Sequence, residues 1–132
     1  MQKLFEKFDV QVKEISDEIW HKVTKTPMIT YYSPERVFIY LHLQKQGLKL
    51  ELFTSGESIE GVKNLEYKRG GAKWGVLYIT DTAQLEKTIP AIKRSYGLIK
   101  DAIRNNEPTG WYADSELESN EDDERTAPND AL

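Results

Sequence analysis

Residues 36–54 carry the clearest alternation of apolar and polar side chains in the chain. Two runs with a period of two flank residues 44–47, which predicts a β-hairpin with Gly47 in its loop. If these four residues form the loop, three aliphatic pairs share one face, because side chains alternate across a strand. Those pairs are Leu43 with Leu48, Leu41 with Leu50, and Ile39 with Leu52. We expect this face to form one wall of the hydrophobic core.

The opposite face of the predicted hairpin is amphipathic. It pairs His42 with Lys49, Tyr40 with Glu51, and Phe38 with Phe53. Such a face is typical of a solvent-exposed surface, a partner surface or the lining of a pocket, and the pattern leaves all three interpretations open.

The N-terminal residues have helical spacing. Apolar side chains recur every three or four positions, which predicts an amphipathic helix over Lys3–Val23. His21 and Lys22 would lie near its C-terminal end, where cations complement the helix dipole.

A second apolar stripe of helical period begins at Leu85 and continues to Ile103. Asp81 or Thr82 can cap this helix. Pro90 lacks an amide hydrogen, so we expect a kink or a restart there.

Two further strands are predicted, at residues 28–32 and 75–80, whereas residues 59–67 fit either a helical turn or an irregular strand. The elements together predict an α+β fold. We expect an antiparallel sheet of four to five strands, covered on its Leu41/Leu50 face by the N-terminal helix and a kinked C-terminal helix.

Charge divides the chain in two. Residues 1–106 hold 17 Lys and Arg against 13 Asp and Glu, a net charge of +4, and form the predicted single domain. Residues 107–132 hold one Arg and nine acidic residues, a net charge of -8, and form a tail predicted to be disordered from about Glu116. The tail is interpreted as a solubilising segment, an internal competitor for the basic surface, or a ligand for a basic partner.

Composition excludes several classes of site. The chain has no cysteine, which rules out disulfides and thiolate chemistry, and the spacing of its two histidines does not predict a metal site. No apolar run approaches the roughly 20 residues that cross a bilayer. The N-terminal residues do not match a signal peptide. We therefore expect a cytoplasmic protein without cofactor, metal or membrane contact.

Candidate binding chemistry lies in the hairpin and in the segment from Lys63 to Trp74. His42 is interpreted as an anion or partner contact, or as a hydrogen-bonded strand residue. The cations of the second segment would neutralise phosphates, and Trp74 would either stack on a base or pack in the core. The predicted binding residues are His42, Lys49, Lys68, Arg69, Lys73 and Trp74.

Three stretches of the chain resemble a known family. Residues 38–52 are similar to a hairpin in which His-Pro-Gln-Lys precedes a Leu-Lys-Leu strand, and residues 73–75 to a His-Trp-Gly turn. Residues 85–100 are similar to the closing helix. The family is the small uncharacterised domain described as "predicted transport protein", which often follows restriction-endonuclease-like modules. Here Leu43 replaces the proline, Lys73 replaces the histidine, and the sequence contains no nuclease module.

Because that family has no established activity, the resemblance implies mainly the fold. The missing nuclease module leaves open whether the chain acts with a nuclease. The leading hypothesis is a non-catalytic binding or accessory module for nucleic acid or for a nucleic-acid-processing protein. One alternative is a metal-dependent nuclease of restriction-endonuclease type that uses Glu51, Glu66 and Lys68. Another is a protein-binding or homodimerisation module that uses the hairpin face of Phe38, Tyr40 and Phe53.

Overall fold

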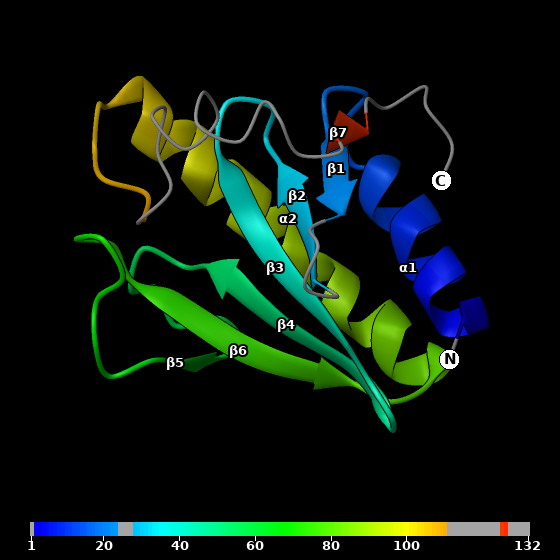
Figure 1. The fold of residues 1–132 in the computed structure, drawn as a ribbon. Coiled ribbons are helices and arrows are strands. Elements are labelled where there is room, and N and C mark those ends of the chain that lie inside the picture. The colour runs from blue at the N-terminus through cyan, green and yellow to red at the C-terminus, as the bar shows by residue number, and fades with distance from the viewer. Residues whose placement is uncertain (1, 24–27, 111–124, 127–132) are drawn as a thin grey trace.

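The computed structural model describes residues 2–23, 28–110 and 125–126. One antiparallel sheet, with strand order β5-β6-β4-β3-β2-β1-β7, packs with two helices (Figure 1). The helices are α1 (Gln2–Lys13) and α2 (Thr82–Arg104). The strands are β1 (Trp20–Val23), β2 (Met28–Tyr32), β3 (Val37–Gln44), β4 (Gly47–Phe53), β5 (Lys63–Asn64), β6 (Trp74–Ile79) and β7 (Arg125–Thr126). The predicted α+β class is confirmed. The sheet has more strands than predicted because β1 takes the place of the end of the predicted N-terminal helix, and because the two-residue β5 and β7 join the edges.

β3 and β4 pair in the predicted register, with Leu41 opposite Leu50. The connecting loop is shorter than predicted, because Gln44 and Gly47 pair with each other and leave two residues between the strands. Glycine is required at position 47 for a reason the sequence did not reveal. A Cβ there would collide with the carbonyl oxygen of Ile79, at the end of β6.

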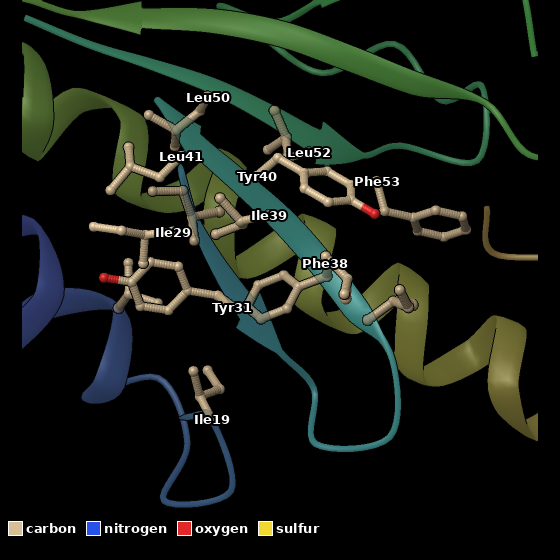
Figure 2. Close-up of a cluster of buried hydrophobic side chains, with 14 of the residues drawn as sticks. Ile19, Ile29, Tyr31, Phe38, Ile39, Tyr40, Leu41, Leu50, Leu52 and Phe53 are labelled. Atoms are coloured by element: carbon tan, nitrogen blue, oxygen red, sulfur yellow. The ribbon is translucent and has the colours of Figure 1, made fainter. Parts of the chain in front are cut away.

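The sheet face that carries Leu41 and Leu50, called here the helix face, is covered by both helices (Figure 1). α2 packs on β3, β4 and β6, and α1 packs against α2. The ring of Phe8 in α1 lies 5.5 Å from that of Tyr31 in β2. Figure 2 shows Leu41, Leu50 and their neighbours gathered in this core. The opposite face, called the second face, carries Lys49 and Glu51.

The N-terminal helix is half as long as predicted. It ends at Lys13, and Trp20–Val23 forms β1 against β2 instead. Residues spaced four apart, such as Ile19 and Val23, satisfy the periods of a helix and of a strand equally. Ser16 decides between them, because its hydroxyl and its carbonyl accept from the amides of Glu18 and Ile19 and so close a turn.

α2 is capped as predicted and is not interrupted at Pro90. The Asp81 carboxylate accepts a hydrogen bond of 2.8 Å from the amide of Gln84. The Gln84 side chain reaches back to accept from the amide of Thr80 at 2.7 Å. The helix continues through Pro90 to Arg104, so of the two alternatives expected there, a kink or a restart, the restart does not occur.

The predicted disorder from Glu116 falls mostly outside the described residues. Arg125–Thr126 form β7, which pairs with β1 opposite His21 and Lys22, and nothing in the sequence pattern predicted that strand. In the described ranges, no helix is long and apolar enough to cross a membrane.

The sequence pattern predicted that His21 lies at the surface, near the end of a helix. It is instead buried in β1, with 2% of its surface exposed. Neither ring nitrogen has a hydrogen-bond partner among the described residues, and Nδ1 lies 3.7 Å from Asp9 Oδ1 of α1. That carboxylate oxygen already accepts from the Tyr31 hydroxyl at 2.8 Å and pairs with Lys13 at 3.3 Å. Burial, and then the charge of Lys13, lower the pKa of His21, and Asp9 only partly opposes them.

This environment predicts a loss of stability in mild acid. The unfolded chain binds a proton at His21 more readily than the folded chain, so the free energy of unfolding should fall as pH drops through about 6.5. The loss is roughly 1.4 kcal/mol for each unit by which folding lowers the pKa. Urea unfolding between pH 8 and pH 5 measures it. His21→Leu should flatten this part of the profile, and an unchanged profile in that variant would show that His21 is not the titrating group.

Candidate functional site

A groove of about 820 Å³ lies on the second face, between the sheet and the segment that contains β5. We call it the β4–β6 groove. It is lined by Lys49 and Glu51 of β4, Gly61, residues 63–67, and residues 76–78 of β6. Strand alternation turns Lys49 and Glu51 toward it, while Leu48, Leu50 and Leu52 turn to the helix face.

Glu51, at the floor of the groove, is held by two basic neighbours. Its Oε1 accepts from Arg69 Nη1 at 3.0 Å and lies 3.6 Å from His42 Nε2. Burial favours the neutral acid, but the hydrogen bond and charge of Arg69, with His42 and Lys49, lower the pKa of Glu51 overall. Glu51 is therefore an anion whose charge is compensated within the protein.

Arg69 is fixed in place by a tight hairpin. The amide of Arg69 donates to the carbonyl of Ala72 at 2.7 Å, and the amide of Ala72 returns a bond of 3.1 Å. Gly70 and Gly71 have φ of 58° and 84°, the backbone of a type I′ turn, which explains both glycines. The guanidinium then lies 5.7 Å from the ring centre of Tyr40.

Trp74, predicted as a stacking residue, is buried, with 1% of its surface exposed. Its ring lies 5.3 Å from Tyr40 and 5.8 Å from Phe53. Its Nε1 donates to the carbonyl of Thr109 at 3.0 Å. The stacking role is wrong for this position, and the core role that the sequence left open is the one observed.

The predicted cations divide between two hollows. Lys49 and Arg69 lie at the β4–β6 groove, with His42 beside them, whereas Lys68 and Lys73 line a smaller cavity of about 260 Å³ near Glu107. Lys63, which joins Lys49 in the groove, was noted as a cation but was not among the predicted binding residues. In the part of the chain that the structure describes, no carboxylate lies within 4 Å of the four lysine ammonium groups.

Two exposed aromatic side chains were missed. Tyr67 and Tyr78 are 59% and 55% exposed, and both line the β4–β6 groove. Strand alternation puts Trp74, Val76 and Tyr78 on one side of β6, but the sequence pattern does not show that this side opens onto a groove.

The groove also holds the two carboxylates of the nuclease hypothesis. Glu51 and Glu66 both line it, but Lys68 lies at the other cavity. Glu51 is engaged by Arg69, so a metal ion would have to displace that guanidinium. Among the described residues, no group of three His, Asp or Glu side chains forms a metal site.

The aromatic face proposed for protein binding is not a surface. Phe38, Tyr40 and Phe53 are all buried. A register shift between β2 and β3 turns Phe38 toward α2, where its ring lies 5.4 Å from that of Tyr96. These side chains therefore belong to the core.

Comparisons with protein-family models, with curated proteins and with solved structures found no match. The resemblance to the "predicted transport protein" family therefore stays a prediction, and the candidate site rests on its own geometry.

Proposed function

We propose that this chain is a cytoplasmic, non-catalytic module that binds nucleic acid, alone or beside a nucleic-acid-processing enzyme. The β4–β6 groove carries the proposal. Lys49 and Lys63 line it without a carboxylate within 4 Å in the described ranges. Phosphates are the partners that such lysines suit, and releasing counterions from a polyanion supplies the affinity.

The groove also contains two acidic residues, Glu51 and Glu66, whose charges would repel a phosphate unless they are neutralised. Glu51 is neutralised by Arg69, so it repels a phosphate weakly. Glu66 is exposed and has no basic side chain within 4 Å in the described chain, so it opposes binding. The smaller cavity is lined by Lys68, Lys73 and Glu107, so over the two hollows and Arg69 the basic side chains outnumber the acidic ones.

Removing the two groove cations should weaken binding and reduce its dependence on salt. For Lys49→Ala/Lys63→Ala, we expect the slope of log K against log salt to become shallower by about 1.4 for a single strand and about 1.8 for a duplex. Fluorescence anisotropy with a labelled oligonucleotide at several salt concentrations measures this slope.

The matched control removes the same charge from the other side of the sheet. Lys87 and Lys93 are exposed on α2, so Lys87→Ala/Lys93→Ala should leave the slope nearly unchanged. Equal effects of the two double variants would show that net charge, and not the groove, governs binding. Absence of binding by the parent protein would reject the proposed function.

The nuclease alternative is kept because Glu51 and Glu66 share the groove. Incubation of DNA with the protein and Mg²⁺ or Mn²⁺ separates the two functions, since a binding module leaves the DNA intact. If the protein cleaves DNA and the Glu66→Ala variant does not, the function is metal-dependent catalysis and not binding alone.

A further inference from the structure

The two tyrosines of the groove carry an inference that rests on the proposed function. Among the described aromatic side chains, only Tyr67 and Tyr78 are largely exposed, and both lie in the same groove. They come from different elements: Tyr78 from β6, and Tyr67 from the segment that follows β5. An exposed aromatic ring next to lysine side chains can stack on a base whose phosphates those lysines bind.

Both lysines lie beside Tyr78, and the hydroxyl of Tyr67 interacts with the guanidinium of Arg69. Lys49 is the cross-strand partner of Tyr78, and Lys63 pairs with Val76, the neighbour of Tyr78 on the same side of β6. A ligand that places a planar ring on Tyr78 therefore has an ammonium group beside it. Nucleotides alternate rings and phosphates in this way.

We infer that the β4–β6 groove binds single-stranded rather than double-stranded nucleic acid, with unpaired bases stacked on Tyr67 and Tyr78. The bases of a duplex are stacked on one another and paired, so their faces are not available to stack on Tyr67 and Tyr78. An unpaired base can turn into the groove while its phosphates stay with Lys49 and Lys63. The same chemistry is offered by single-stranded DNA and RNA.

Anisotropy titrations with short oligothymidylate, oligouridylate and a DNA duplex of equal length test the inference. We expect both single strands to bind more tightly than the duplex. Tyr67→Leu/Tyr78→Leu should weaken single-strand binding at least about 25-fold and change duplex binding little, since each of the two stacked bases contributes a factor of roughly five or more. A preference between the two single strands would report contacts to the 2′-hydroxyl or the base edges.

Tyr67→Phe/Tyr78→Phe is the control, because it keeps both rings and should stay within about twofold of the parent protein. Duplex binding equal to or tighter than single-strand binding would overturn the inference, as would full single-strand affinity in the leucine variant. If lysine-dependent binding remains in either case, the proposed function stands and only the strand preference fails. If no oligonucleotide binds, both fail together.

Discussion

Replacing Trp74 with alanine should lower the free energy of unfolding by roughly 3–5 kcal/mol, the range for buried aromatic truncations. The ring is enclosed by Tyr40 and Phe53, and its indole nitrogen holds the carbonyl of Thr109. Alanine leaves a cavity and an unpaired carbonyl at once. Equilibrium unfolding in urea measures the loss.

Trp74→Phe separates these two contributions. It retains most of the packing and removes the hydrogen bond to Thr109, so it should account for about 1–3 kcal/mol of the loss. A change of less than about 1 kcal/mol in Trp74→Ala would mean that the ring is not buried, and would revive its role as a stacking residue.

Breaking the pair of Glu51 and Arg69 should have the second largest effect. Their side chains are only 16% and 15% exposed, so Arg69→Met leaves a largely buried carboxylate without its partner. We expect a loss of roughly 2–3 kcal/mol at neutral pH, below the value for fully buried pairs because some solvent reaches the site. Glu51→Leu/Arg69→Met should recover more than half of this loss, because no unpaired charge remains.

The pH dependence of this loss has a definite sign. In the parent protein the pKa of Glu51 is lowered, so the stability from its ionised form is present above about 4.5 and is lost as pH falls through the lower, folded value. In Arg69→Met, burial raises the pKa of Glu51, so this carboxylate is protonated in mild acid and the cost of its unpaired charge disappears. The stability difference between the parent and Arg69→Met should narrow as pH falls below about 5. A constant difference would contradict the assigned pair.

The strands were predictable wherever alternation was strict. The hairpin register of Leu41 with Leu50 followed from period two and from the position of the loop around Gly47, and the structure confirms it. The helix predicted over Lys3–Val23 is wrong for its second half, because a spacing of four residues fits the period of a helix and that of a strand. A local turn at Ser16 ends the helical part, and residues 20–23 form a strand. That turn depends on side-chain competition for backbone groups, which a hydrophobic pattern does not contain.

For the candidate site, the sequence predicted the position of the charged residue Lys49, but it did not predict which aromatic side chains are exposed and which are buried. The pattern placed Lys49 on the amphipathic side of the hairpin, where the structure has it. The burial of Trp74 depends on the segment of residues 105–110, where the carbonyl of Thr109 accepts a hydrogen bond from the indole nitrogen. Contacts between segments so far apart in sequence leave no local signal.

The central claim is that polynucleotides bind to this protein at the β4–β6 groove. Titration of the ¹⁵N-labelled protein with a single-stranded oligonucleotide, followed by amide chemical shifts, tests this claim directly. The predicted result is a set of shifts concentrated in β4, residues 61–67 and β6, with the exposed side of α2 unaffected. Shifts centred on α1 or α2, or no shifts at all, would contradict it.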